Sequence, residues 1–316
     1  MSNAITDELA LAVARAPINA AIAAARLVGR GDERAADQAA VDAMRASLNV
    51  LPIRGRVVIG EGERDDAPML YVGETVGAGK GPEIDIALDP LEGTTLAAKA
   101  KANALAVIAI APKGGLLHAP DTYMDKIAIG PGYAEGVVDL DASIQDNVNA
   151  LAKAKGVKAE EIGVCVLDRP RHGGIIEALR SAGARVHLIG DGDIAGVIHC
   201  TKPDTGIDMY VGSGGAPEGV LAAAALRCVG GQFQGRLVIR NEEERERAKQ
   251  AGIDDLKRRY DLNDLVSGDA VFIATGVTSG SLLDGVRFAQ GSIQSHTLIL
   301  NAATRAVSEL RVRQPV

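Results

Sequence analysis

The stretch IDIALDPLEGTTLAAKA, residues 84–100, runs as an apolar strand into two acids, Asp89 and Glu92. The acids are three residues apart, so a tight turn can bring both carboxylates to one point. Gly93 lets a ligand approach the backbone, and Thr94 opens a predicted helix whose free N–H groups suit an anion. This combination predicts a divalent cation between the two carboxylates. On this stretch alone, a strand followed by an Asp-Pro turn and a Thr N-cap remains the alternative.

Three more acids lie where predicted strands end or predicted helices begin. Glu61 follows the apolar run VVIG between two glycines, Asp37 lies at a helix start, and Glu218 lies in the first turn of another helix. Taken singly, they also fit a solvated turn, an N-cap and a favourable helix dipole. Oxygen ligands without a thiolate or paired histidines select a hard ion, so we expect Mg²⁺ or Mn²⁺ rather than zinc.

Basic side chains follow another predicted strand. The loop LDRPRHGG carries Arg169 and Arg171, and the loop IGDGDIAG after the next strand carries Asp191 and Asp193. Guanidinium groups suit phosphate oxygens, and aspartates at a strand end can accept hydrogen bonds from sugar hydroxyls. The two loops therefore predict a sugar-phosphate site, with a mixed-charge surface loop as the alternative.

Short β-rich runs alternate with Ala-rich helical stretches along the chain, a pattern typical of a layered α/β fold. The predicted strands are 56–60, 84–88, 105–111, 162–167, 185–190, 207–212 and 270–276. The predicted helices are 4–28, 37–49, 143–155, 173–182, 217–229 and 242–252. Several polar loops follow strands directly, where open α/β sheets bind ligands. We expect one unit over residues 1–316, with a division into a metal-binding half, about 1–140, and a substrate-binding half, 141–316, as the alternative.

The composition excludes several classes of protein. The chain has 316 residues, 47% of them hydrophobic, which is enough for a large core. A net charge of -7 and 3% aromatic residues argue against a nucleic-acid surface. Cys165, Cys200 and Cys228 are odd in number and lie in apolar segments, which favours buried thiols in a reducing cytoplasm. Arg15 and Pro17 interrupt the apolar N-terminal run, so we expect neither a signal peptide nor a membrane span.

Seven motifs in order resemble those of class II fructose-1,6-bisphosphatases, and the resemblance covers nearly the whole chain. They are VVIGEGERDDAPMLYVGE, DPLEGTTL, NALAVIAIAPKG, YMDKIAIGPG, RPRH, DGD and GGAPEG. The D-P-[IL]-[DE]-G-T element is shared with the wider family of metal-dependent, lithium-sensitive sugar and inositol phosphatases, so the class II assignment depends on the other six. The resemblance implies an α-β-α-β-α layered fold, Mn²⁺ or Mg²⁺ as cofactor, a sugar bisphosphate substrate, and a homo-oligomer, dimer or tetramer.

The resemblance also implies a role for individual residues. The implied metal ligands are five acids: Asp37, Glu61, Asp89, Glu92 and Glu218. The implied catalytic residues are Asp65 and Thr94, which would orient and activate the attacking water. The implied substrate contacts are Glu92, Gly93, Thr94, Tyr123, Arg169, Pro170, Arg171, His172, Asp191, Gly192, Asp193 and Gly215. The chain departs from the family at Glu33, where members commonly carry Lys, which places an anion close to the helix of Asp37.

The implied activity is hydrolysis of the 1-phosphate of fructose 1,6-bisphosphate. The nearest alternative is sedoheptulose 1,7-bisphosphatase activity, alone or shared. An inositol-type monophosphatase fits less well, because the RPRH and DGD loops suit a second phosphate on a sugar. A non-catalytic sugar-phosphate sensor is the alternative from another class, and Glu33 motivates it.

Overall fold

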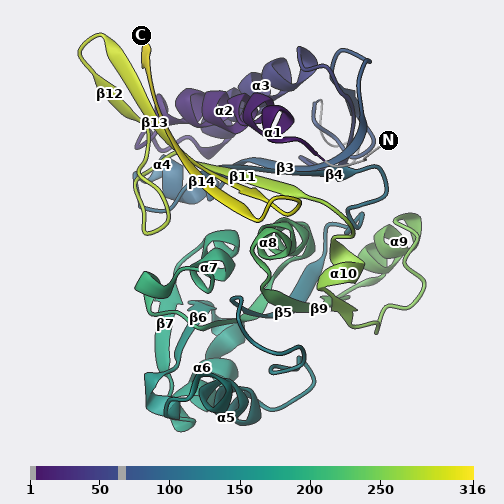
Figure 1. Cartoon of the computed structure of the whole chain (residues 1–316), viewed down its shortest axis with the longest axis vertical. Coiled ribbons are helices and arrows are strands. Elements are labelled where there is room, and N and C mark those ends of the chain that lie inside the picture. The colour runs from purple at the N-terminus through teal and green to yellow at the C-terminus, as the bar shows by residue number, and fades with distance from the viewer. Residues whose placement is uncertain (1–4, 63–68) are drawn as a thin grey trace. The chain divides into compact units, whose positions relative to one another are not determined.

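The computed structural model describes residues 5–62 and 69–316 (Figure 1). The chain forms two compact units: unit 1 comprises Met1–Leu117 and Val266–Val316, and unit 2 comprises His118–Leu265. The expected halves divided near residue 140, whereas here the C-terminal segment returns to unit 1. The physical reason is that β11 (Val271–Gly276) pairs with β4 (Leu105–Pro112) over six residue pairs and so completes the first sheet.

Unit 1 contains an eight-stranded sheet in the order β12-β13-β11-β4-β3-β1-β2, with β14 paired to β13. The remaining strands are β1 (Arg54–Ile59), β2 (Thr75–Val76), β3 (Glu83–Glu92), β12 (Arg287–Ala289), β13 (Ser292–Asn301) and β14 (Ala306–Pro315). β1 and β3 are parallel neighbours, so both carboxyl ends lie at one edge of the sheet. Glu61 and Asp89 therefore come from adjacent strand ends.

The first apolar segment forms two helices, α1 (Asp7–Val13) and α2 (Arg15–Ala25), rather than the single expected helix over 4–28. Pro17 lies in the first turn of α2, where its missing N–H costs no helical hydrogen bond. By length and composition Asp7–Ala25 is able to span a membrane, but 56% of its most apolar window is buried inside the structure. Its alanines and isoleucines belong to the core of unit 1, which accounts for the apolar composition.

Helix α3 (Glu33–Asn49) begins four residues before the expected start. Asp32 caps it by accepting a hydrogen bond from the Ala35 amide at 2.9 Å. Asp37 consequently lies inside the helix, and its interpretation as an N-cap was wrong. The helix buries one stripe of side chains against the unit 1 core: Ala36, Ala40, Val41, Met44 and Leu48.

Unit 2 contains a six-stranded sheet in the order β10-β9-β5-β8-β6-β7. Its strands are β5 (Tyr123–Ile129), β6 (Gly163–Leu167), β7 (Arg185–Ile189), β8 (Met209–Gly215), β9 (Gln232–Val238) and β10 (Tyr260–Asp261). Parallel pairing of β6 with β7 places the RPRH and DGD loops at the same sheet edge. The central strand β5 was recognised only as part of a motif, and β9 was missed.

Helices cover both faces of the unit 2 sheet, with α5 (Ile144–Lys155) and α6 (Gly173–Ser181) on one face and α7 (Asp193–His199) and α8 (Ala216–Val229) on the other (Figure 1). The short helices are α4 (Thr94–Ala98) in unit 1, and α9 (Glu242–Gln250) and α10 (Leu262–Leu265) in unit 2. The layered α/β class is therefore confirmed. The three cysteines are buried, as expected.

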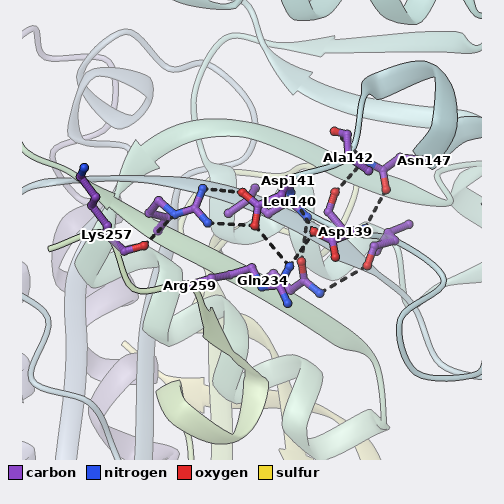
Figure 2. A network of polar contacts seen from close by, with 10 residues as sticks. Asp139, Leu140, Asp141, Ala142, Asn147, Gln234, Lys257 and Arg259 are labelled. Carbon is purple, nitrogen blue, oxygen red and sulfur yellow. Dashed lines mark hydrogen bonds and ion pairs between the residues drawn. The ribbon is translucent and has the colours of Figure 1, made fainter. Parts of the chain in front are cut away.

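A polar network fixes the connection between β5 and α5 (Figure 2). The guanidinium of Arg236 on β9 makes two hydrogen bonds to Asp141, at 2.7 and 3.0 Å. Arg259 donates to Asp139 at 2.6 Å, and the side chain of Asn147 donates to the Asp139 carbonyl. The hydrogen bonds from Arg236 lower the pKa of Asp141. The loop that follows β5 is thus tied to the adjacent strand by charge-assisted bonds.

Candidate functional site

Asp89 and Glu92 lie at the end of β3, where the strand is irregular rather than turned. Asp89 pairs with Val107 and Glu92 pairs with Leu105, so three steps on β3 oppose two steps on β4. Such a bulge puts the two acids on the same face of the strand. A carboxylate oxygen of Asp89 and one of Glu92 lie within 4.8 Å of each other. The expected convergence is present, and a β-bulge produces it instead of a tight turn.

Glu61 follows the adjacent strand β1 and is positioned by Gly60. A Cβ at Gly60 would lie 2.0 Å from the Leu70 carbonyl oxygen, so only glycine allows this close passage of the two chain segments. The Glu61 amide in turn donates to the same Leu70 carbonyl at 3.1 Å. The glycines around Glu61 therefore have a packing role in holding the end of β1.

Asp37, Glu61 and Asp89 share one electrostatic environment. Burial, together with the nearby charges of Asp37 and Asp89, raises the pKa of Glu61 to about 8. Burial also raises the pKa of Asp37, while a hydrogen bond with Glu61 opposes this shift. Like charges this close favour a neutral form or a bound cation. Half-buried carboxylates with no thiolate among them form a donor set that fits Mg²⁺ or Mn²⁺.

Gly93 and Thr94 follow these acids directly. Gly93 has φ +83° and is the N-cap of α4, so Thr94 is the first helical residue and not the cap. Helix α4 has only five residues, which makes the expected contribution of a helix dipole small. The catalytic roles of Thr94 and Asp65 stay predictions, and Asp65 lies outside the described residues.

Glu33 is the residue at which the chain departs from the resemblance. It lies in the first turn of α3, and its carboxylate accepts a 2.9 Å hydrogen bond from the Thr95 hydroxyl of α4. Glu33 therefore links the helix of Asp37 to the helix that begins at Thr94.

In unit 2 the two predicted substrate loops lie next to each other. Arg169 and Asp191 form an ion pair at 3.6 Å, and both side chains remain more than one third exposed. Pro170 begins a short 3₁₀ turn, Pro170–His172, that leads into α6. The pairing of the RPRH and DGD loops is therefore present, with charged groups accessible at their tips.

Arg171 and Tyr123 form a second cluster in unit 2. The guanidinium of Arg171 donates twice to the Ser213 carbonyl, at 2.9 and 2.7 Å, and lies 4.9 Å from the Tyr123 ring centroid. Arg240 lies closer to the same ring, at 4.1 Å. Its guanidinium is held by Glu244 through Nε at 2.8 Å and Nη2 at 2.5 Å. These contacts orient cationic groups before any ligand arrives.

His172 and Asp193, both expected to contact substrate, are turned inward. His172 is 1% exposed, and its Nε2 accepts a hydrogen bond from the Ser213 amide. Its Nδ1 therefore donates to the Leu167 carbonyl, 2.7 Å away. Asp193 is 6% exposed and directs its carboxylate to Lys126. Direct contacts of these two side chains with substrate stay predictions, and here both side chains organise the loops.

Gly215 and Glu218 lie at the junction of β8 and α8. A Cβ on Gly215 would approach a Glu218 carboxylate oxygen to 1.8 Å, so the side chain of Glu218 folds back over the glycine. Glu218 lies in the first turn of α8, as the sequence predicted. The glycine is therefore required for the position of this predicted ligand.

No functional role is predicted for Arg240 and Lys126 from the sequence. Arg240 follows β9 and shares no motif with the substrate loops, and only the antiparallel pairing of Tyr123 with Val238 brings it to the ring. Lys126 lies within the motif YMDKIAIGPG, but the motif alone does not distinguish it from other residues of the strand.

The convergent acids of unit 1 and the arginine-bearing loops of unit 2 define a class, the metal-dependent sugar phosphatases of the α/β type. The family model described as bacterial fructose-1,6-bisphosphatase, glpX-encoded, matches residues 7–314. The chain is 45% identical to the D-fructose 1,6-bisphosphatase class 2/sedoheptulose 1,7-bisphosphatase of Synechococcus sp. strain JA-3-3Ab, over 95% of this chain and 94% of that protein. A protein of the same description from Synechococcus elongatus is 46% identical, over 90% of each chain. The chain belongs to the glpX-encoded family of bacterial fructose-1,6-bisphosphatases.

Proposed function

We propose that this protein hydrolyses the 1-phosphate of fructose 1,6-bisphosphate to give fructose 6-phosphate and inorganic phosphate, with Mn²⁺ or Mg²⁺ as cofactor. The observation that carries the proposal is the convergence of carboxylates at the ends of β1 and β3 in a chain of this family. Burial and mutual repulsion raise the pKa of Glu61, which is the expected electrostatics of a cation site in its metal-free form.

The residues have separate tasks in this reaction. Asp37, Glu61, Asp89 and Glu92 of unit 1 would hold the cations, and Glu218 stays a predicted metal ligand. Bound divalent cations neutralise phosphate oxygens and activate water. The Thr94 hydroxyl would orient the attacking water. Thr94 and the Asp65 carboxylate would together form the relay that removes the proton of this water. Gly93 leaves the backbone before Thr94 open to the phosphate.

The loops of unit 2 would bind the sugar and the phosphate that is not cleaved. Arg171 supplies a guanidinium oriented by the Ser213 carbonyl, Arg169 supplies an accessible guanidinium, and Asp191 supplies an accessible acceptor for a hydroxyl. Tyr123 offers an aromatic face that two arginines already flank. Pro170, Gly192 and Gly215 shape the backbone of these loops.

Sedoheptulose 1,7-bisphosphate is a second candidate substrate, because the relatives carry a double description that includes it. Phosphate release should be measured with both bisphosphates, fructose 1-phosphate and an inositol phosphate, each with Mn²⁺, Mg²⁺ and chelator. The proposal expects turnover of fructose 1,6-bisphosphate that disappears with chelator and returns with metal. Absence of release from every bisphosphate would leave a sugar-phosphate sensor.

We further propose a homo-oligomeric cytoplasmic enzyme that binds neither nucleic acid nor membrane. The buried cysteines support a reducing compartment. Light scattering on the purified protein would give the number of subunits, and a monomeric mass would contradict this part of the proposal.

A further inference from the structure

Lys126 is a lysine in the core of unit 2. It lies in the middle of β5 with 1% of its side chain exposed, and its ammonium is 2.5 Å from Oδ2 of Asp193, whose side chain is 7% exposed. Removing two charges from water is costly, and a buried ion pair often stabilises a fold no better than a well-packed apolar pair. The pair therefore calls for an explanation other than stability.

The surroundings of the pair show which segments it holds. A Cβ on Gly214 of β8 would lie 2.3 Å from Oδ2 of Asp193 and 3.3 Å from Nζ of Lys126. A Cβ on Gly219 of α8 would lie 3.3 Å from Cε of Lys126. Two glycines thus let the end of β8 and the start of α8 close over the pair.

The aspartates of the DGD loop have different environments. Asp193 is turned into the core, whereas the side chain of Asp191 is 40% exposed and pairs with Arg169. Gly192 between them has φ +84°, a left-handed conformation that sends the two side chains in different directions. Fixing Asp193 therefore fixes the point from which Asp191 projects.

We propose that Lys126 is a positioning residue for substrate, acting through Asp193 to place Asp191 and its partner Arg169 at the sugar and the uncleaved phosphate. The inference rests on the proposed function, since it assigns the DGD loop to the bisphosphate. Lys126 itself is buried and would act only through Asp193. Groups that bind a remote part of the substrate contribute mainly uniform binding, so loss of Lys126 raises KM more than it lowers kcat.

The decisive experiment is a double-mutant cycle of Lys126→Met and Asp193→Asn. Lys126→Met leaves the Asp193 carboxylate buried without its partner, and Asp193→Asn leaves the Lys126 ammonium buried without a counter-charge, so each lowers Tm. The double variant has a neutral pair of similar volume, so its Tm should return most of the way to the wild-type value. It nevertheless shows a KM for fructose 1,6-bisphosphate raised about 10-fold, the scale of one lost charge-assisted contact, with kcat within about twofold of wild type.

The matched control is Lys155→Met with Asp208→Asn, an ion pair of equal length in the same unit that lies away from the DGD loop. This double variant should keep the wild-type KM. A further test uses Asp191→Ala as the background, in which the Lys126/Asp193 double change should add nothing to KM. If the double variant does not fold, Asp193→Asn alone keeps an acceptor for the ammonium and should raise KM in the same direction.

A double variant with wild-type Tm and wild-type KM would overturn the proposal, as would an equal rise in KM in the Asp191→Ala background. Failure of the proposed function gives a different result, because wild type itself would then release no phosphate from fructose 1,6-bisphosphate. The dissociation constant of that bisphosphate, measured by calorimetry, would then decide the role of Lys126. Equal affinity of wild type and double variant would refute it.

Discussion

The two units treat charge in opposite ways. In unit 1, burial and the nearby charges of Asp37 and Asp89 raise the pKa of Glu61 to about 8. In unit 2, Lys126 neutralises Asp193 within the fold, and Arg240 likewise neutralises Glu244. Like charges are crowded at the predicted metal site of the first unit, and opposite charges are paired at Asp193 and Glu244 of the second.

The two arrangements of charge differ in whether they need a cofactor for stability. Crowded carboxylates raise the free energy of the metal-free fold, and a cation relieves this cost. Paired charges hold loops in place without any cofactor. The metal-free protein should therefore gain stability when one of the crowded acids Asp37, Glu61 or Asp89 is removed, and it should lose stability when the pairs of unit 2 are broken.

The largest effect is expected for the acids of β3. Asp89→Ala or Glu92→Ala should lower turnover by at least ~10²-fold. Even mutation of a residue that hydrogen-bonds to a metal ligand typically costs about 10- to 100-fold in metal affinity or activity. In chelator, either variant should melt at the wild-type temperature or above it, since one repelling charge is gone. Kinetics with Mn²⁺ and thermal unfolding in chelator test the two statements.

Asp85 on the same strand is the matched control for β3. It is buried and accepts a 2.6 Å hydrogen bond from the Gly114 amide, and it lies at the other end of the strand. Asp85→Asn should lower Tm without changing the metal dependence of turnover. A metal-free Asp89→Ala protein that melts well below wild type would assign these acids to the fold and remove the contrast between the units.

The next largest effect concerns adjacent threonines of α4. Thr94→Ala should lower kcat by roughly 10²-fold with little change in KM, the scale of a general acid–base contribution. Thr95→Ala is its control, because the Thr95 hydroxyl is used in a hydrogen bond to Glu33. Near-equal rates for the two variants would make Thr94 only a helix-starting residue.

How much of this arrangement the sequence predicts depends on whether the signal is local. Asp89 and Glu92 follow an apolar run and precede Gly93, and Glu218 follows a glycine-rich segment at a helix start, so a short window shows all three. The strand β14 carries charged, mostly exposed side chains, and no strand is predicted there from the sequence. It forms because it pairs with β13 over ten residue pairs, which no local pattern reveals.

The same division applies to the sites. The arginines of RPRH were predicted from their place after β6, since a strand end is a local feature. Lys126 gains its role from Asp193, 67 residues away, and Arg240 gains its role from stacking on Tyr123, which depends on sheet pairing. The inward turn of His172 likewise follows from a contact with Ser213, distant in sequence.

The arginine contacts of unit 2 come third in size. Arg171→Ala should lower kcat/KM for fructose 1,6-bisphosphate by about 10- to 150-fold, which corresponds to roughly 1.5–3 kcal/mol for a charge-assisted contact. Most of the change should appear in KM, since this contact binds a remote group. Arg169→Ala should behave alike, with a smaller effect because its pair with Asp191 is looser.

Fructose 1-phosphate is the control substrate for both arginine variants, because it lacks the second phosphate. The preference for the bisphosphate over the monophosphate should therefore fall in each variant. If both substrates lose the same factor, the arginines serve the reacting phosphate or the fold, and unit 2 would not be a separate binding surface.

The smallest effect is a pH dependence carried by Glu244. Its carboxylate is fully buried and accepts hydrogen bonds from Arg240, which lower its pKa below the ordinary value of 4.5. A carboxyl group with a lower pKa in the folded state adds stability above the unfolded value and loses it as the pH falls through the folded value. Glu244→Gln should therefore lower Tm by a few °C at neutral pH, and the gap to wild type should close below about pH 4.5.

Glu246→Gln on the same helix removes an exposed pair with Lys249, and such pairs contribute little. It should melt like wild type at every pH. A Tm gap for Glu244→Gln that stays constant with pH would mean that packing, and not the paired charge, holds Arg240 beside Tyr123.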